Sequence, residues 1–248
     1  MGADAGMLAT LFEMSMGLGD EWRVSDVWFE EGESSVLHVR VERVPGRAVP
    51  CLACGAPCGV HDSRERTWRH LDIWQCETVV YCRVPRVDCP EHGVRTARMP
   101  WEVRPRSHFT ALFEAQALVM AMSGMTATAI SAQLRVPDST VWRMLGRAVS
   151  EARDGADYSG VTLVGIDETA CRRGQSYVSC MVDLDGRRVV AVAEGHGRDA
   201  PSELCRQLEA HGGDRLRVAE VTRDMSNVRA GLNQPPESRT KVANFSRI

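Results

Sequence analysis

The chain has 248 residues, of which 44% are hydrophobic and 25% are charged, and its formal net charge at pH 7 is -3. This length allows one large domain or two to three small ones, and the composition is that of an ordinary soluble globular protein. The net charge gives no support to nucleic-acid binding by the chain as a whole. Arginines nevertheless gather in two stretches that allow a local basic face, from Arg40 to Arg106 and at Arg135, Arg143, Arg147 and Arg153.

Neither a membrane span nor a secretory leader is expected. No apolar run approaches the ~20 residues that a membrane helix needs, and the N-terminus lacks the basic segment and the long apolar segment of a signal peptide. The 9 cysteines are an odd number, and several are spaced as metal ligands rather than as a disulfide framework. We therefore expect a cytoplasmic protein.

Residues 1–49 predict a helix followed by a β-hairpin. Apolar residues recur at helical spacing in residues 4–19, and one face of this helix should carry Leu8, Leu11, Phe12 and Met16. Residues 22–29 and 36–44 alternate between apolar and polar side chains, which is typical of half-buried strands. The glycine and polar residues between the two runs are turn-forming.

Residues 50–100 predict a zinc ribbon. The segment opens with Cys51-x-x-Cys54-Gly55 and closes with Cys89-x-x-His92-Gly93. Each pair can present two ligands from one tight turn, and the following glycine allows the positive φ that such a turn often needs. Two turns of this kind facing each other predict a tetrahedral Cys₃His site for a structural Zn²⁺. The separation between the two turns is longer than is usual for such sites.

Two other interpretations of these cysteines stay open. A compact set within the first half of the segment is the main alternative, with the ligands Cys51, Cys54, Cys58 and His61, but it leaves Cys89 and His92 without a role. The other is that the cysteines are ordinary buried side chains. Cys76 and Cys82 lie in strand-like sequence and are expected to serve packing alone.

Residues 106–155 predict a helix-turn-helix DNA-binding domain. A first helix over 109–122 is followed by a helix over 127–134 that Thr126 can cap, and a third begins at Asp138 or Ser139. In this motif the second helix of the pair enters the major groove. The expected DNA contacts are Ser139, Thr140, Arg143 and Arg147, whereas the expected inward side chains are Val141, Leu145 and Val149. A plain helical linker is the alternative.

Residues 160–231 predict part of a ribonuclease-H-like α/β core. Three strand-like runs at 161–166, 177–184 and 188–193 precede a helix over 201–211 and a fourth strand over 216–222. Asp185-Gly186 predicts a tight turn between the second and third strands. Three antiparallel strands, a crossover helix and a strand parallel to the first match the start of that fold.

Two aspartates should meet at one edge of this sheet. Asp167 follows the first strand and Asp224 follows the fourth, so they should end side by side. Paired carboxylates repel unless a cation lies between them, and oxygen ligands suit Mg²⁺ or Mn²⁺. Such a metal site can promote attack on a phosphodiester. Glu168, Asp183 and Asp185 are competing acids, of which the last two flank a hairpin and should be solvated.

These motifs resemble those of ISL3-type insertion-sequence transposases, which are DDE enzymes. The resemblance covers about Cys51 to Gly231. It rests on both zinc turns and on the following stretches, as they stand in this chain: His61-Asp62-Ser63-Arg64, Trp68-Arg69-His70-Leu71-Asp72, Arg83-Val84-Pro85-Arg86-Val87, Val164-Gly165-Ile166-Asp167-Glu168-Thr169, Arg172-Arg173-Gly174, Tyr177-Val178-Ser179 and Asp224-Met225-Ser226.

The resemblance implies that Asp167 and Asp224 are the first two acids of a DDE triad. It also implies binding to the terminal inverted repeats of a mobile element, self-association on DNA, and a bacterial protein that is associated with the nucleoid when bound to DNA. The family's third acid is a glutamate far beyond the second aspartate. Residues 232–248 form a divergent tail without that segment, and Glu237 follows two prolines in loop-like sequence.

Three functions are therefore expected to compete. The first is a truncated transposase with impaired catalysis. The second is a DNA-binding module that represses or competes with a full-length transposase at the element ends. The third is a decayed reading frame whose product does not fold stably. DNA nicking that depends on Mg²⁺ and on Asp167 distinguishes the first from the second.

Overall fold

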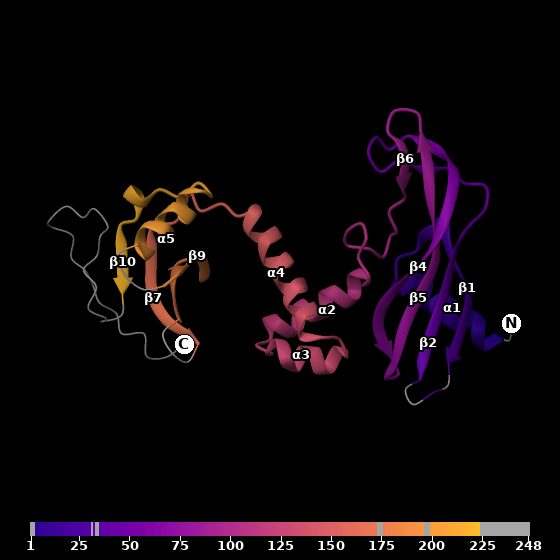
Figure 1. The fold of residues 1–248 in the computed structure, drawn as a ribbon, viewed down its shortest axis with the longest axis horizontal. Helices are drawn as coiled ribbons and strands as arrows, with labels where there is room; N and C mark the ends of the chain where they lie inside the picture. The colour runs from indigo at the N-terminus through magenta and orange to yellow at the C-terminus, as the bar shows by residue number, and fades with distance from the viewer. Residues whose placement is uncertain (1–2, 31, 33–34, 173–175, 196–198, 224–248) are drawn as a thin grey trace. The chain divides into compact units, whose positions relative to one another are not determined.

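The computed structural model describes residues 3–30, 32, 35–172, 176–195 and 199–223. These residues divide into two compact units, Met1–Val149 and Ser150–Ile248, each with its own β-sheet (Figure 1). Among the helices of these residues, none is long and apolar enough to cross a membrane. The chain is a multidomain protein of mixed α+β and α/β class, as the sequence predicts.

The first unit is built on one six-stranded sheet with the strand order β1-β2-β5-β4-β3, and β6 pairs with β5. Its elements are α1 Ala3–Ser15, a 3-10 turn Gly19–Glu21, β1 Trp22–Glu30, β2 Val36–Arg43, β3 Val49–Pro50, β4 Pro57–Ile73, β5 Cys76–Cys89 and β6 Gly93–Thr96. β1 and β2 form the predicted antiparallel hairpin. β2 runs parallel to β5, so the expected boundary between residues 49 and 50 falls inside this sheet.

One hydrophobic core joins the N-terminal helix, the hairpin and the ribbon. Three alternating apolar side chains of β2, Leu37, Val39 and Val41, are fully buried, because alternate residues of a strand face one side of the sheet. Phe12 of α1 and Met16 just after it are buried against the same core. The prediction that Leu11 lies on the buried face of this helix is wrong. Leu11 is 52% exposed, because it lies outside the face of α1 that packs against the sheet.

β4 and β5 form a long antiparallel hairpin that explains the unusual spacing of the two zinc turns. The pairing extends from Gly59 opposite Asp88 to Ile73 opposite Cys76. Both ends of the 51–92 segment therefore return to the same end of the hairpin. The sequence predicts the strand that becomes β5, whereas β4 was not anticipated, because its run of charged and polar residues hides the strand pattern.

Three helices follow the sheet as the sequence predicts, with α2 at Ala111–Met122, α3 at Ala127–Leu134 and α4 at Asp138–Asp154. The Thr126 hydroxyl accepts a hydrogen bond from the Ala129 N–H, so this residue caps α3 as expected. Thr110 caps α2 in the same way, through the N–H of Phe113. The core between the helices consists mainly of Phe113, Ala117, Met120, Ile130, Leu134, Val141 and Met144.

The helices are attached to the sheet by paired backbone and side-chain contacts. The Arg69 N–H donates to the His108 carbonyl at 2.8 Å, and the Thr110 N–H donates to the Arg69 carbonyl at 3.1 Å. Beside this bridge, Nδ1 of buried His70 lies 2.9 Å from the Thr110 hydroxyl. Thr110 thus holds β4 and caps α2 at once.

His70 should make this unit sensitive to acid. Burial, assisted by the charge of Arg69, lowers the pKa of His70 from 6.5 to about 4. The unfolded chain therefore binds a proton between these two values that the folded protein excludes. The free energy of unfolding should fall by about 1.4 kcal/mol per pH unit from this group as pH drops from 6.5 towards 4. Chemical denaturation of the wild type and of His70→Gln across this range measures the difference, and parallel stability curves would contradict the expectation.

The second unit contains a four-stranded sheet with the order β10-β7-β8-β9. Its elements are β7 Leu163–Arg172, β8 Ser176–Asp183, β9 Arg188–Glu194, α5 Ala200–Glu209, a 3-10 turn Arg215–Arg217 and β10 Glu220–Arg223. β7, β8 and β9 are antiparallel, and β10 returns after α5 to pair in parallel with β7. This is the predicted partial ribonuclease-H-like sheet, with Leu204, Cys205 and Leu208 of α5 buried as expected.

Three details of this unit differ from the sequence prediction. β7 continues through Arg172 instead of ending at Ile166, because β8 pairs with it along that length. The turn after β8 spans residues 184–187, and Arg187 rather than a glycine adopts positive φ, at 49°. β10 starts only at Glu220, since residues 215–217 form a 3-10 turn.

Candidate functional site

Four predicted zinc ligands come together at one end of the first sheet. The ligand atoms of Cys51, Cys54, Cys89 and His92 all lie within 4.8 Å of one another. Cys54 Sγ is 3.7 Å from Cys89 Sγ, and Cys89 Sγ is 3.6 Å from His92 Nδ1. Around a tetrahedral Zn²⁺ with ordinary bond lengths, two sulfurs lie about 3.8 Å apart and a sulfur and a nitrogen about 3.6 Å apart. The donor set and these spacings therefore fit zinc.

Tight turns present these ligands. The Gly55 N–H donates to the Cys51 carbonyl and the Cys51 N–H donates to the Ala56 carbonyl, both at 2.8 Å. Gly55 and Gly93 have φ of 73° and 63°, so the glycine after each ligand pair has the positive φ that the sequence predicts. The β4–β5 hairpin then brings the second turn back to the first.

The first turn also favours the thiolate form of Cys51. Backbone N–H groups of Cys54 and Ala53 point at its sulfur and lower the pKa of Cys51 to about 7. Since the thiolate is the metal ligand, this residue is prepared for zinc near neutral pH.

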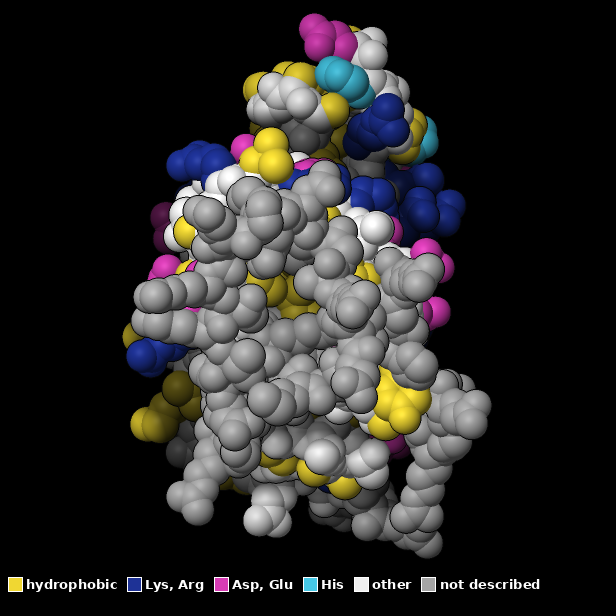
Figure 2. All heavy atoms as spheres, turned by 90° about the vertical axis from the view of Figure 1, so that its left-hand side faces the viewer, with side chains coloured by type: hydrophobic (Ala, Val, Ile, Leu, Met, Phe, Trp, Pro, Cys, Tyr) yellow, Lys and Arg dark blue, Asp and Glu magenta, His cyan; other side chains and the backbone are white. Residues whose placement is uncertain are grey.

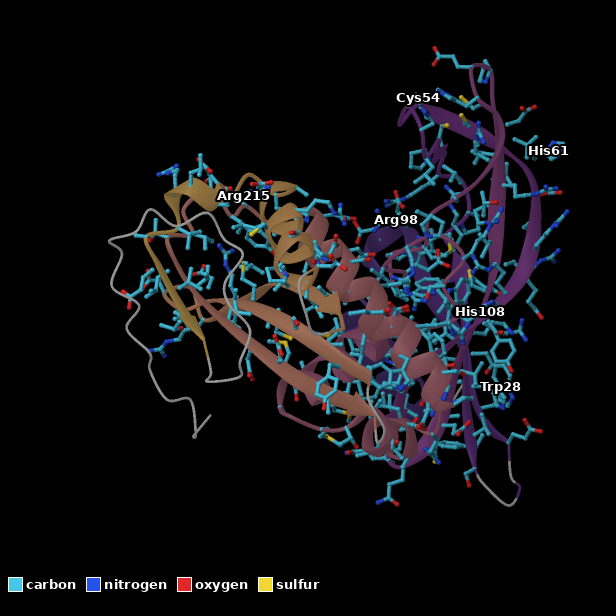
Figure 3. The ribbon with its side chains drawn as sticks, turned by 60° about the vertical axis from the view of Figure 1, so that its left-hand side comes forward. Trp28, Cys54, His61, Arg98, His108 and Arg215 are labelled. Atoms are coloured by element: carbon cyan, nitrogen blue, oxygen red, sulfur yellow. The ribbon has the colours of Figure 1, made fainter. Side chains whose placement is uncertain are left out.

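The compact alternative set is not assembled in the structure. His61 is exposed, and in Figure 3 it lies well apart from Cys54. Cys58 is buried near the cluster, where burial and then the Cys89 thiol raise its pKa. Its sulfur instead donates to the Ala56 carbonyl at 3.4 Å. Cys58 therefore packs beside the four-ligand group.

The predicted recognition helix, α4, presents a somewhat different face from the one expected. Thr140 is only 7% exposed, so it does not face solvent as a DNA contact. Its hydroxyl accepts a hydrogen bond from Arg143 Nη2 at 3.0 Å. Val149, expected to pack inward, is 65% exposed. The helix buries Thr140, Val141 and Met144, while Leu145 is half-buried and packs against the same core, as predicted.

The solvent-facing side of α4 begins with Ser139, Trp142 and Arg143. Ser139 and Arg143 are exposed as predicted, and Trp142 is 64% exposed. Arg147 is half-buried, and its Nε is buried without a hydrogen-bond partner among the described residues. Sequence reasoning did not assign Trp142 to the DNA face, although a large aromatic residue at an exposed helical position is the signal for such a role.

A basic groove of about 720 Å³ lies on the first sheet. Its arginines come from the first arginine-rich stretch of the sequence, Arg40 to Arg106. Arg66 is held there by buried Glu102 at 3.0 Å and stacks over Trp68. The basic side chains lining the groove are Arg64, Arg66, Arg86, Arg95 and Arg106, beside His108, which Figure 3 labels. The guanidinium groups of Arg64, Arg95 and Arg106 form no hydrogen bond or ion pair within the described part of the chain. In Figure 2, several side chains coloured for Lys and Arg are visible in the upper part of the view, below the Asp or Glu and His side chains at its top.

Asp167 lies within β7, next to the residue that pairs with Arg223 of β10. Arg223, the last residue of β10, pairs with Ile166, and Asp167 follows directly. The prediction that Asp167 ends its own strand is wrong, because the β7–β8 pairing continues, with Cys180 opposite Asp167. Asp167 is exposed, and its Oδ1 accepts a hydrogen bond from the Glu168 N–H at 2.8 Å. Asp224 lies outside the described residues.

Asp183 and Asp185, the competing acids of the β8–β9 hairpin, differ in their burial. Asp183 is buried, which corrects the expectation that it is solvated. It pairs with Arg188 at 3.2 Å and accepts a hydrogen bond from the Gly186 N–H at 3.0 Å, so it stabilises the turn. Asp185 is exposed as expected.

Comparison with known families gives three matches in chain order. Residues 47–92 match a model described as the zinc-finger of transposase IS204/IS1001/IS1096/IS1165. Residues 98–149 match the helix-turn-helix domain of transposase family ISL3. Residues 164–230 match a model described as transposase, for the DDE domain of the same family. No solved structure matches the chain.

Curated relatives agree with these models. The chain is 29% identical over 195 residues to the transposase for insertion sequence element IS1557 of Mycobacterium tuberculosis, a match that covers 76% of this chain and 43% of the relative. It is 24% identical over 214 residues to the transposase for insertion sequence element IS1001 of Bordetella parapertussis, covering 84% of this chain and 51% of the relative. The chain thus spans about half the length of these relatives. With all three domain models in their order along it, the chain belongs to the ISL3 family of insertion-sequence transposases.

Proposed function

We propose that this chain acts as an insertion-sequence transposase that binds the terminal inverted repeats of its element. We further propose that a complete catalytic domain of this kind cleaves and transfers DNA strands in a metal-dependent reaction. The observation that carries the catalytic part is the parallel pairing of β10 with β7, in which Arg223 lies opposite Ile166, the residue directly before Asp167. The residue that follows Arg223 in the sequence, Asp224, is the neighbouring acid of the proposed metal site.

Asp167 and Asp224 are the proposed catalytic acids and magnesium ligands. Asp224 follows β10 directly in the sequence, as Asp167 follows Ile166. Two carboxylates held close together favour a hard divalent cation, Mg²⁺ or Mn²⁺. When bound, that ion would lower the barrier for attack on a phosphodiester by stabilising charge on its oxygens.

Zinc is proposed to have a structural role, held by the four-ligand group of Cys51, Cys54, Cys89 and His92. The proposed organisation along the chain is an N-terminal helix and hairpin over 1–49, a zinc ribbon over 50–100, a helix-turn-helix domain over 106–155, a catalytic core over 160–231 and a tail over 232–248. The first two segments share one sheet and should unfold together.

The DNA-binding residues proposed on α4 are Ser139, Arg143 and Arg147, with Thr140 acting indirectly. Arg143 Nε donates to the Ser139 carbonyl at 3.2 Å, and Nη2 donates to the Thr140 hydroxyl. These bonds hold the guanidinium along the first turn of the helix, and its remaining N–H groups can donate to a base edge or a phosphate. Trp142, beside it, adds an exposed aromatic surface.

Replacing Arg143 with alanine should weaken binding to the element end by roughly tenfold to a hundredfold, since a base-reading arginine is worth about 1–3 kcal/mol. Binding to a scrambled duplex should change much less. Fluorescence anisotropy with both duplexes measures the difference. Arg206→Ala is a matched control, because Arg206 is an exposed arginine of the second unit paired with Glu203.

Substitutions in the basic groove should affect DNA binding differently from substitutions in α4. Changing Arg64, Arg95 and Arg106 together to glutamine should weaken binding to both duplexes alike. If each arginine neutralises one phosphate, the slope of log affinity against log salt should fall by about 2.7. An equal loss of specificity from the groove variant and from Arg143→Ala would contradict this division between phosphate contacts and base reading.

The alternative is a DNA-binding protein that represses or competes with a longer transposase. The chain covers 43% and 51% of its relatives while matching both the zinc-ribbon and helix-turn-helix models. Binding to element ends without nicking in Mg²⁺ or Mn²⁺ supports this second function. Self-association on DNA, which both functions allow, is tested by the stoichiometry of the complex, and association with the nucleoid by imaging a labelled protein in cells.

A further inference from the structure

The turn between β4 and β5 is built from two residues that its backbone conformation disfavours. Ile73 pairs with Cys76, which leaves Trp74 and Gln75 as a two-residue turn with φ of 49° and 66°. Two successive positive φ values are typical of a type I′ turn, for which Asn-Gly is the preferred pair. Larger side chains crowd the backbone in this region, so Trp74 and Gln75 cost stability at this position.

The same turn exposes a large apolar surface. The Trp74 side chain is 69% exposed, although tryptophan is on average a highly buried residue. Strained backbone and exposed aromatic side chains both concentrate at binding sites, where the partner rather than the fold explains them. Their coincidence at one hairpin tip indicates that the tip contacts a partner.

The hairpin tip is fixed to the turn of the helix-turn-helix domain. Arg135, which ends α3 with φ of 55°, donates from Nη2 to the Gln75 carbonyl at 2.8 Å and from Nε to Asp72 at 3.1 Å. It also lies 3.7 Å from Glu77. Arg135 therefore clamps both strands of the tip against the loop that leads into α4.

Packing below the tip makes this attachment rigid. Leu71 packs against the core of the three helices, and the Arg69 guanidinium lies over the Phe113 ring at 5.5 Å. The hairpin end and the helix-turn-helix domain therefore move as one body. The backbone of the Trp74–Gln75 turn is therefore attached to Arg135, which lies three residues before the start of α4.

We propose that the β4–β5 hairpin tip is a second DNA-binding element, in which Trp74 packs against the sugars and groove edge of duplex DNA beside the groove that α4 enters. This inference rests on the proposed DNA-binding function. A helix-turn-helix domain directs the N-terminus of its second helix to the major groove, so a tip clamped to the preceding turn approaches the adjacent backbone. Apolar side chains commonly make such contacts with DNA.

The charges around the tip are compatible with DNA as the partner. The two acids next to the tip, Asp72 and Glu77, are each paired with Arg69 and Arg135. These pairs reduce the repulsion that a phosphate would meet on approach. The contact that remains is apolar, so losing it should lower affinity without changing the dependence on salt.

The test replaces the turn with its preferred pair in the full chain, as the double variant Trp74→Asn/Gln75→Gly. This change should raise the thermal unfolding midpoint by about 2 to 4 °C, because it relieves the strain. It should also weaken binding to a labelled duplex carrying the element end about tenfold, with an unchanged salt slope. Trp74→Phe should weaken binding to the same duplex by about half as much on a logarithmic scale. Met14→Gln is the control for an exposed apolar residue, since Met14 is 78% exposed.

The possible outcomes separate this inference from the proposed function. Affinity within twofold of the wild type, in a double variant that is more stable, overturns the inference and leaves the function intact. A wild-type protein that binds neither the element end nor a scrambled duplex overturns both. Light scattering without DNA gives a further outcome. If the wild type is a dimer and the double variant is a monomer with unchanged DNA affinity, the tip is a protein contact and the inference is overturned.

Discussion

Replacing Cys89 with serine should remove zinc from the protein and unfold the zinc-binding end of the first sheet. Cys89 Sγ lies between ligands of the two turns, 3.7 Å from Cys54 Sγ and 3.6 Å from His92 Nδ1. Its loss leaves three ligands and opens a tetrahedral site. Loss of a structural metal is among the most destabilising single changes, at about 4 kcal/mol or more. Elemental analysis of the purified protein should fall from one zinc per chain to none.

The unfolding should be local, because much of the core that the whole sheet shares lies away from the zinc-binding turns. Trp68 of β4 and Val80 of β5 are fully buried and pair with each other towards the other end of the hairpin. Amide hydrogen exchange should therefore accelerate at residues 49–60 and 87–96 and stay slow around Trp68. Loss of protection throughout the first unit would contradict local unfolding.

Cys58→Ser provides the matched control. Cys58 is a buried thiol next to the four-ligand group but donates to the Ala56 carbonyl, so its variant should keep one zinc. The compact set of Cys51, Cys54, Cys58 and His61 predicts the reverse pattern, in which Cys58→Ser loses the metal and Cys89→Ser keeps it. The two variants together therefore distinguish the ligand sets.

The sequence predicts the elements of this chain well where periodicity or turn chemistry is strong. The β2 alternation, the Thr126 cap and the order of strands in the second unit are confirmed. Each ligand pair is followed by a glycine, which is typical of a tight turn. The sequence alone therefore predicts the four-ligand group that the structure brings together. These signals are local, and each depends on a few neighbouring residues.

The errors arise where tertiary contacts decide. The inward face of α4 includes Met144 beside the predicted Val141 and Leu145 but leaves Val149 exposed, because the packing of the three helices decides which apolar positions are covered. The pairing partner β8 extends β7 beyond Asp167, which the residues of β7 alone do not reveal. Arg135 clamps a hairpin that lies about 60 residues earlier in the chain, and no local pattern predicts such a contact.

Replacing Asp167 with asparagine should abolish metal-dependent DNA cleavage while leaving DNA affinity unchanged. The substitution keeps the shape of the side chain but removes the charge that a hard cation needs. Asp167 is exposed on β7 and its described hydrogen bond is to the adjacent Glu168 N–H, so the fold should tolerate asparagine. Loss of a metal ligand in a phosphoryl-transfer site should lower the rate by roughly 10³-fold or more.

The assay should use two forms of the protein, since the chain spans about half the length of its relatives. One is the chain as it stands, and the other is the chain extended with any downstream coding sequence in its reading frame. Both are incubated with end-containing DNA in Mg²⁺ and in Mn²⁺, and nicks are mapped on a sequencing gel. Cleavage by either form must disappear in its Asp167→Asn variant if Asp167 is a catalytic acid.

Asp185→Asn is the control that separates a metal ligand from a general loss of negative charge. Asp185 is an exposed acid in the turn after β8, whereas Asp167 directly follows Ile166, which pairs with Arg223 of β10. The position of an acid beside the β10–β7 pair, rather than its charge, should decide activity. Equal loss of cleavage in both variants would show that the effect is electrostatic and diffuse. Unchanged cleavage in Asp167→Asn would remove this residue from the metal site and, with it, the parallel β10–β7 pairing as the basis of the catalytic centre.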